Sequence, residues 1–251
     1  MIPIIMSLLF WGFILITSFI LFPIALLIWL VTFLFDRRLV ILHIFTSFWA
    51  SLYTWLNPLW RVTINGRERI YSKRTYIIVS NHQSLVDILV LFRLFVHYKW
   101  VSKIEIFKVP LIGWNMVLNR YIKLNRGSTA SNREMMLACE KTLEAGSSIL
   151  MFPEGTRSPD GEIRSFKKGA FELALKTKKS ILPIAIEGSS KALPKKGFIL
   201  KGKHQIRVQV LDEIPYQNFA NDSVDTLTEK VHLIIKDEIE RIRNEYRISN
   251  Q

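Results

Sequence analysis

The sequence predicts an α/β domain, with a mixed, mostly parallel sheet flanked by helices, behind an N-terminal membrane-anchoring helical segment. Two observations lead to this fold class. Residues 2–35 form an almost uninterrupted apolar run, whereas from residue 60 onward short β-like runs alternate with stretches of helical apolar spacing. Such alternation is typical of a sheet covered by helices. We therefore expect a membrane anchor with an interfacial helix over residues 1–59 and one domain over residues 60–251.

The apolar run over residues 2–35 is longer than one membrane crossing needs. At about 1.5 Å per residue an unbroken helix reaches about 50 Å, against about 30 Å for the hydrocarbon core of a bilayer. Pro23 offers a kink or a break. Two arrangements stay open: one long, tilted or kinked span, or a span over roughly 4–22 followed by a re-entrant or interfacial piece. A cleaved signal peptide is disfavoured, because no Lys or Arg precedes the run and no small-residue cleavage site follows it.

Arg37 and Arg38 directly follow the run. The positive-inside rule then places the N-terminus outside and everything after Arg38 in the cytoplasm. Residues 39–60 are uncharged, and Asn57-Pro58 is expected to end a helix within them. They predict a helix in or near the cytoplasmic interface, with a second transmembrane span as the alternative. The interfacial reading depends on amphipathic aromatics that favour headgroup depth, namely Trp49, Tyr53, Trp55 and Trp60.

The rest of the chain divides into seven expected strands and four expected helices. Helical apolar spacing covers residues 84–96, 129–145, 167–177 and about 223–246, the last with apolar residues on one face only. The expected strands are Trp60–Ile64, Tyr76–Ser80, Tyr98–Ser102, Tyr121–Leu124, Ser148–Phe152, Ile181–Ile186 and Ile206–Leu211.

Charge is concentrated after the apolar segment. The net charge is +13, of which residues 1–60 contribute only +1. A basic surface suits nucleic acid, an anionic membrane or a phosphate-bearing substrate, and the apolar segment favours the membrane over nucleic acid. Lysines at 191, 195, 196, 201 and 203 could contact anionic headgroups or form a solvated basic loop. The single cysteine, Cys139, excludes an intrachain disulfide and is expected to be buried. No metal-ligand spacing is present, so neither a metal nor another cofactor is expected.

The first candidate site is Asn81-His82-Gln83-Ser84-Leu85-Val86-Asp87, which follows an expected strand and leads into an expected helix. Histidine is the side chain best suited to move a proton near neutral pH. A carboxylate on one ring nitrogen fixes the tautomer and leaves the other nitrogen free to accept a proton. The chain can fold back to bring His82 and Asp87 together. The alternative is a helix-capping arrangement of Ser84 and Asp87, with His82 an ordinary loop residue.

The second candidate site, Phe152-Pro153-Glu154-Gly155-Thr156-Arg157-Ser158, also follows an expected strand. Gly155 permits close approach of the backbone to a ligand, and Arg157 offers a planar fork for two phosphate oxygens. The hydroxyls of Thr156 and Ser158 can add bonds. Lys167 and Lys168, ahead of a helix, would strengthen an anion site. The alternative is a polar turn in which Arg157 pairs with Glu154 or Asp160.

Together, N-H-x4-D and F-P-E-G-T-R-S resemble the signature blocks of the glycerolipid acyltransferase family, which includes 1-acylglycerol-3-phosphate acyltransferases. The stretch Tyr121–Arg126 resembles a third block, with Asn125 in place of the family's acid. Ile181–Ala185 resembles a fourth. Residues 100–114, with Trp100, Lys103 and Pro110, resemble the family's loop that faces the acyl chain. The resemblance covers about residues 60–190.

The resemblance implies direct acyl transfer at a membrane, without cofactor, metal or nucleic acid. His82 would take the proton of the acceptor's free sn-2 hydroxyl, oriented by Asp87, and the donor would be acyl-CoA or acyl-carrier protein. The acceptor would be a lysophospholipid, 1-acylglycerol-3-phosphate above all. Its phosphate would be held by Arg157, Arg126 and the backbone of Glu154, Gly155 and Thr156. Accessory contacts are expected from Asn81, Ser84, Lys103, Ser158, Lys167 and Lys168.

Three other functions stay open at this stage. The acceptor could be another lysophospholipid or glycerol-3-phosphate. In a different class, the chain could be a non-catalytic, membrane-tethered protein that binds anions through its basic face. That function needs no His82 and predicts affinity that falls steeply with salt.

Overall fold

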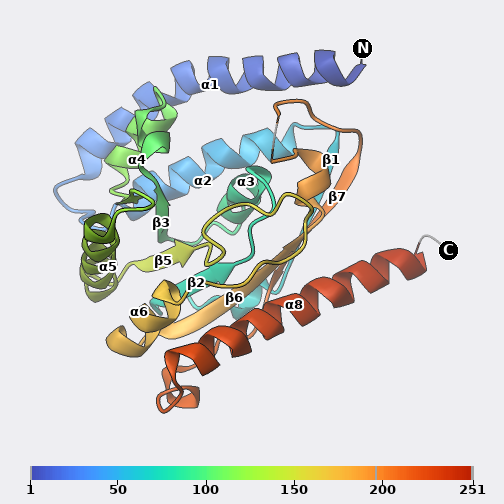
Figure 1. Cartoon of the computed structure of the whole chain (residues 1–251). Coiled ribbons are helices and arrows are strands. Elements are labelled where there is room, and N and C mark those ends of the chain that lie inside the picture. Colours follow the sequence, from blue (N-terminus) through green and yellow to red (C-terminus); the bar gives the residue numbers. More distant parts are fainter. Residues whose placement is uncertain (1, 196, 250–251) are drawn as a thin grey trace.

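The computed structural model describes residues 2–195 and 197–249. Between its two long terminal helices lies a seven-stranded sheet (Figure 1). In chain order the helices and strands are α1 (Ile2–Thr32), α2 (Val40–Trp55), β1 (Trp60–Asn65), β2 (Tyr76–Ser80), α3 (Val86–Phe92), β3 (Tyr98–Lys103), α4 (Ile112–Leu118), β4 (Ile122–Leu124), α5 (Thr129–Glu144), β5 (Ser148–Met151), α6 (Gly169–Thr177), β6 (Ser180–Glu187), α7 (Ser189–Ala192), β7 (His204–Val210) and α8 (Val224–Ser249).

The strand order is β1-β7-β6-β2-β5-β3-β4, and every neighbouring pair is parallel except β6–β7. The expected mixed, mostly parallel sheet is therefore confirmed. The neighbouring strands β2 and β5 are buried along their whole length. Because they are parallel, the loops that follow them leave the same edge of the sheet. This brings together the two segments singled out in the sequence, 81–87 and 152–158.

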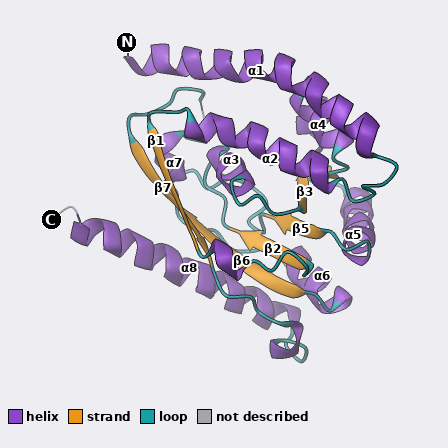
Figure 2. Cartoon of the chain, turned by 180° about the vertical axis from the view of Figure 1, so that it is seen from behind, coloured by secondary structure: helices purple, strands orange, loops and turns teal. Residues whose placement is uncertain are grey.

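The sheet is buried on both faces by helices (Figures 1 and 2). Successive β2 side chains point to opposite faces. Tyr76 and Ile78 pack with residues of α1, α2 and α3 in one core, and Ile77 and Val79 with residues of α5, α6 and α8 in the other. Cys139 lies wholly buried in the second core, as expected, and burial raises the pKa of its thiol to about 12.

The expected strands all form, with ends within two residues of the prediction, and differences are confined to helices. The expected helix over 84–96 ends at Phe92, because Phe95 adopts a left-handed conformation in the turn toward β3. The short helices α4 and α7 were not predicted, since neither has the length to show apolar periodicity.

Helix α1 continues unbroken through Pro23, so the alternative of a span over 4–22 with a separate second piece is wrong. Residues 3–32 are long and apolar enough to cross a membrane, by length and composition only. One face of α1 packs on the protein, and the other exposes large apolar side chains along its length. More than half of each of the following side chains is exposed: Leu8, Leu9, Leu15, Ile16, Phe19, Ile20, Leu27, Leu30 and Val31.

Both ends of α1 contact the rest of the domain. Near its start, Ser7 Oγ accepts a hydrogen bond from Leu200 N at 2.9 Å, and Trp11 Nε1 donates to Phe198 O at 2.7 Å. Just beyond its end, Arg38 donates to Gly146 O at 2.9 Å. A helix that crossed a bilayer could not touch one domain at both ends. These contacts conflict with the expectation that α1 carries the N-terminus to the opposite side of the membrane.

Helix α2 lies between α1 and the sheet rather than at a lipid interface. Trp49 and Tyr53 are 4% and 5% exposed, and Thr17 of α1 hydrogen-bonds to the Tyr53 hydroxyl at 3.0 Å. Trp60 is also buried, and only Trp55 is largely exposed. The expected headgroup position of these aromatics is therefore wrong for Trp49, Tyr53 and Trp60, because α1 covers them. In the described residues, α1 and α2 share a core with the sheet, and the division at residue 59 into an anchor and a domain stays a prediction.

Candidate active site

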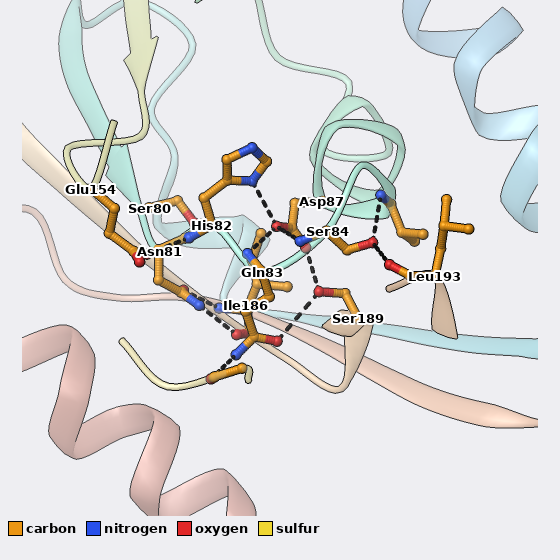
Figure 3. A network of polar contacts seen from close by, with 12 residues as sticks. Ser80, Asn81, His82, Gln83, Ser84, Asp87, Glu154, Ile186, Ser189 and Leu193 are labelled. Atoms are coloured by element: carbon orange, nitrogen blue, oxygen red, sulfur yellow. Dashed lines mark hydrogen bonds and ion pairs between the residues drawn. The ribbon is translucent and has the colours of Figure 1, made fainter. Parts of the chain in front are cut away.

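The loop after β2 wraps around the carboxylate of Asp87 (Figure 3). Asp87 stands in the first turn of α3 and is wholly buried. Its Oδ2 accepts hydrogen bonds from His82 Nδ1 at 2.9 Å, Gln83 N at 2.6 Å and Ser84 N at 2.8 Å. The spacing of four residues between His82 and Asp87 thus lets the backbone and the imidazole share one acceptor. The expected pairing is present, and the capping role proposed as its alternative is present with it.

A residue distant in sequence completes the surroundings of Asp87. Ser189, the first residue of α7, donates from Oγ to Asp87 Oδ1 and lies 3.3 Å from the side-chain oxygen of Gln83 (Figure 3). With four donors around it, the buried carboxylate is fully hydrogen-bonded. Sequence reasoning missed Ser189, because nothing in the local pattern after β6 links it to the loop after β2.

The His82 imidazole is held in one orientation. Because Nδ1 faces a carboxylate, that nitrogen carries the proton and Nε2 is left with a lone pair. The ring stacks on Phe152, with centroids 3.9 Å apart and planes 9° apart. His82 lines a cavity of ≈ 420 Å³. The arrangement presents a proton acceptor of fixed tautomer to this cavity.

Glu154 ties the two motif segments together. Its buried carboxylate accepts from His82 N at 2.6 Å and from Arg164 N at 3.2 Å, and Ser158 N donates to His82 O at 2.8 Å. Burial raises the pKa of Glu154 to about 7, and the two backbone hydrogen bonds oppose that rise. Both oxygens are thus engaged with the scaffold, so the side chain of Glu154 positions the His82 loop and only its backbone is left for a ligand.

Arg157 and Arg126 bring positive charge to the same cavity. Arg157 is half-buried and Arg126 exposed, and within residues 2–195 and 197–249 neither has an ion-pair partner. Burial lowers the pKa of the Arg157 guanidinium, the charge of Asp87 raises it, and the charge of Arg126 lowers it further. Two guanidinium groups that are close enough to interact, and that form no ion pair in the described residues, have the chemistry to bind an anion.

The turn between these groups depends on Gly155, whose φ is +69°. A Cβ here would lie 2.9 Å from Lys167 Cε, so the lysine side chain lies directly over the turn. Thr156 follows in the same turn, half-buried. Lys103 lines the cavity as well, 3.2 Å from the carboxylate of Glu105. Lys103 thus lines the cavity, whereas Lys167 lies over the turn without lining it, and the accessory roles of both stay predictions.

Four other expected accessory residues serve the scaffold instead. Both polar atoms of the Asn81 side chain pair with the backbone of Ile186 at 2.8 Å, which joins the end of β2 to β6. Each of the other three binds a different part of the protein: Ser84 Oγ donates to Leu193 O at 2.6 Å, Ser158 Oγ to Asp160 at 2.6 Å, and Lys168 pairs with Asp225 of α8 at 2.6 Å. None of the four lines the cavity.

Beyond His82 the cavity is mainly apolar. Its wall comes from α1, α2, α3, β3 and the segment around α4, which includes part of the expected 100–114 loop. Sequence reasoning did not place α1 or α2 at the site, since it read both as membrane elements. The aromatic lining residues are Phe10, Trp11, Trp49, Tyr53, Trp60, Phe92, Trp100, Tyr121 and Phe152. The cavity can therefore hold an apolar chain next to a proton acceptor and an anion site.

Comparison with known proteins decides the family. The acyltransferase family model matches residues 61–187, which carry both motif segments. The chain belongs to the acyltransferase family.

Relatives of the chain include a chloroplastic 1-acyl-sn-glycerol-3-phosphate acyltransferase of Arabidopsis thaliana, 40% identical over 61% of the chain and 42% of the relative. A Chlamydomonas reinhardtii protein of that name is 34% identical over 78% of the chain and 59% of the relative. One of Saccharomyces cerevisiae is 33% identical over 72% and 60%. The chain thus spans about half the length of the curated relatives it matches first.

The fold also matches a solved structure. The crystal structure of the 1-acyl-sn-glycerophosphate (LPA) acyltransferase PlsC from Thermotoga maritima superposes with a TM-score of 0.72 at 24% identity, covering 96% of each chain. The similarity extends over the N-terminal helices as well as the α/β domain, so the arrangement of α1 and α2 belongs to this fold.

Proposed function

We propose that the chain transfers a fatty acyl group from a thioester donor to the free sn-2 hydroxyl of 1-acylglycerol-3-phosphate, giving phosphatidic acid. One observation carries the proposal. A single cavity is lined by His82, by two arginines without acidic partners and by apolar walls. An acceptor of this class carries a hydroxyl, a phosphate and an acyl chain, and the cavity offers one complementary group for each.

The reaction follows from the groups around His82. Nε2 removes the proton of the sn-2 hydroxyl as its oxygen attacks the thioester carbonyl, and Asp87 stabilises the imidazolium that forms. The new ester C–O bond forms, the C–S bond breaks, and the proton leaves His82 for the departing thiolate. General base action typically contributes about 10²–10⁴-fold, and orientation of the acceptor by Arg157 and Arg126 adds to it.

Direct transfer is favoured over a covalent acyl-enzyme. The two serines in the motif segments donate their hydroxyl protons elsewhere, Ser84 to Leu193 O and Ser158 to Asp160. Neither hydroxyl is hydrogen-bonded to the imidazole of His82, as the hydroxyl of a serine nucleophile would be. The acceptor hydroxyl is therefore the nucleophile in this mechanism.

The apolar part of the cavity favours a lysophospholipid over glycerol-3-phosphate. Glycerol-3-phosphate needs only the polar end near Arg157, and an apolar lining built from three helices would serve no part of it. Relatives named 1-acyl-sn-glycerol-3-phosphate acyltransferase support the phosphate-bearing acceptor. A non-catalytic anion-binding protein would have no use for the hydrogen-bonded His82–Asp87 pair.

We propose that residues 1–59 anchor the enzyme in one leaflet, with the catalytic domain on the cytoplasmic face. The exposed apolar face of α1 supports membrane binding, and its contacts at Ser7 and Trp11 support insertion from one side. Soluble thioester donors, acyl-CoA or acyl-carrier protein, then reach the active site from the cytoplasm while the acceptor stays in the bilayer.

The test is the His82→Ala variant of the full chain in a thioester-release assay with 1-acylglycerol-3-phosphate. We expect transfer to be nearly abolished while vesicle binding is unchanged. Mass spectrometry of lipids formed from a panel of acceptors, with mixed acyl-CoA and acyl-carrier-protein donors, identifies the substrates. Normal turnover by the variant would remove His82 from the mechanism.

A further inference from the structure

The segment between α7 and β7 carries an unusual concentration of charge. Residues 193–203 contain four lysines and no acidic residue, in a chain whose net charge is +13. An apolar tripeptide, Phe198-Ile199-Leu200, stands among these basic residues. Residues 197–203, named here the 197–203 loop, contain this tripeptide together with Lys201 and Lys203.

In the 197–203 loop one large apolar side chain is buried and two are exposed. Leu200 is 1% exposed and packs beneath α1, whereas Phe198 is 69% and Ile199 49% exposed. Gly197 and Gly202 adopt positive φ on either side and have open space around them. An aromatic side chain displayed to this extent at a loop tip, next to another large apolar residue, is characteristic of a contact surface.

This apolar tip is joined to the exposed face of α1. Trp11 donates from Nε1 to Phe198 O at 2.7 Å, and the two rings meet edge to face with centroids 5.5 Å apart. Leu200 N donates to Ser7 Oγ at 2.9 Å. Both views show the loop between α7 and β7 reaching the N-terminal half of α1 (Figures 1 and 2). The tip therefore extends the apolar face on which Leu8 and Leu9 are exposed.

Cations lie beside the apolar tip. Lys201 and Lys203 are exposed, and in the described part of the chain neither has an acidic partner. Apolar side chains next to unpaired lysines match a bilayer, where the former enter the acyl region and the ammonium groups reach lipid phosphates. A soluble acidic partner would match the lysines but would leave Phe198 and Ile199 without a reason to be exposed.

We propose that the 197–203 loop is a second membrane-binding element, which inserts Phe198 and Ile199 beside α1 and places Lys201 and Lys203 on anionic headgroups. The inference rests on the proposed function in that α1 itself lies in the bilayer.

The proposed insertion of the loop also bears on the active site. The chain between α7 and the 197–203 loop includes Leu193, which lines the cavity. The carbonyl oxygen of Leu193 accepts a hydrogen bond from the Ser84 hydroxyl at 2.6 Å. Insertion of the loop fixes this side of the cavity at the membrane surface.

The experiment uses an environment-sensitive fluorophore on single introduced cysteines in the full chain. The native thiol of Cys139 is wholly buried and does not compete for the label. Phe198→Cys is the test position, and Ile199→Cys replaces it if the first variant does not fold. Leu27→Cys, 60% exposed on α1, reports membrane binding by the anchor. Ile248→Cys, 74% exposed, is the matched control, because it stands on α8, which lies across the sheet from α1 (Figure 1).

Vesicles contain phosphatidylcholine and phosphatidylglycerol in equal amounts, with brominated acyl chains as quencher. We expect labels at 198 and 27 to shift to shorter wavelength and be quenched, and the label at 248 to stay aqueous. Lys201→Gln with Lys203→Gln should lower insertion at 198 by roughly tenfold or more on these vesicles and leave it unchanged on pure phosphatidylcholine. A lipid signal at 27 with an aqueous signal at 198 overturns this inference alone. An aqueous signal at 27 overturns the membrane anchoring in the proposed function as well.

Discussion

The Asp87→Asn variant separates the charge of Asp87 from its geometry. Asp87 Oδ2 accepts three N–H donors, from His82, Gln83 and Ser84, while Oδ1 faces the rotatable hydroxyl of Ser189. The three donors therefore select the amide orientation that leaves oxygen at the Oδ2 position. Ser189 can turn its hydroxyl to accept from the new NH₂ group. The tautomer of His82 is then preserved, and the negative charge is the main loss.

The size of the effect follows from the charge pair that forms during proton transfer. Opposite unit charges about 4 Å apart interact by about 4 kcal/mol at an effective dielectric constant near 20. The amide oxygen keeps part of this interaction, so we expect to lose about 2–3 kcal/mol of transition-state stabilisation, or roughly 30- to 150-fold in kcat. KM for the acceptor should change little, because its phosphate is held at Arg157.

The assay is initial-rate thioester release, with the melting temperature measured in parallel. Asp87→Ala is the matched control, because it also leaves Gln83 N and Ser84 N without an acceptor, at about 1–3 kcal/mol each. We expect it to melt lower and to turn over at least tenfold more slowly than Asp87→Asn. Wild-type kcat in Asp87→Asn would refute the electrostatic role of Asp87. Equal defects in both variants would refute its role in holding the His82 loop.

Three further variants test other parts of the account. Arg157→Ala should raise KM for 1-acylglycerol-3-phosphate by about 100-fold and leave transfer to 1-monoacylglycerol unchanged, because only the first acceptor carries a phosphate. Equal losses on both acceptors would contradict the anion site. Ser189→Ala leaves Asp87 Oδ1 without its donor and should lower the free energy of unfolding by about 1–3 kcal/mol and kcat by about tenfold. Both values should recover in Ser189→Thr. An unchanged kcat in Ser189→Ala would rule out positioning by this hydroxyl. Lys99 is buried, and burial lowers its pKa from 10.5 to about 7. Above about pH 7 the unfolded chain therefore binds more protons than the folded chain. The free energy of unfolding should then rise by up to about 1.4 kcal/mol per pH unit. Urea unfolding of wild type and Lys99→Met between about pH 7 and pH 9 measures this rise, which the variant should lack; parallel curves would exclude Lys99 as its source.

The sheet could be predicted from the sequence because each central strand has a recognisable local pattern of residues. The runs at 76–80 and 148–152 are short, apolar and followed at once by polar residues, which is the pattern of central parallel strands. Once these strands are parallel neighbours, the convergence of His82 with Arg157 follows from topology. The prediction that both residues act on one acceptor came from the family resemblance of the two motif segments, and the strand order gives its structural reason.

The roles of other residues depend on contacts between distant segments and could not be read locally. Nothing around Ser189 indicates that it faces Asp87, and Glu154 gives no sign in sequence that it binds the backbone of His82 rather than a ligand. Trp49 and Tyr53 are amphipathic aromatics that suit headgroups and protein cores equally well. The packing of α1 on α2 buries both side chains in the protein core rather than leaving them at lipid headgroups. No local sequence pattern predicts that packing.

A crystal structure of the protein with 1-acylglycerol-3-phosphate, in the absence of donor, tests the central claim most directly. The account predicts the lipid's free hydroxyl within about 3 Å of His82 Nε2, its phosphate between Arg157 and Arg126, and its acyl chain in contact with bilayer-facing apolar residues or the cavity wall. A phosphate bound away from both arginines, or a hydroxyl beyond reach of the imidazole even through one water, would contradict it.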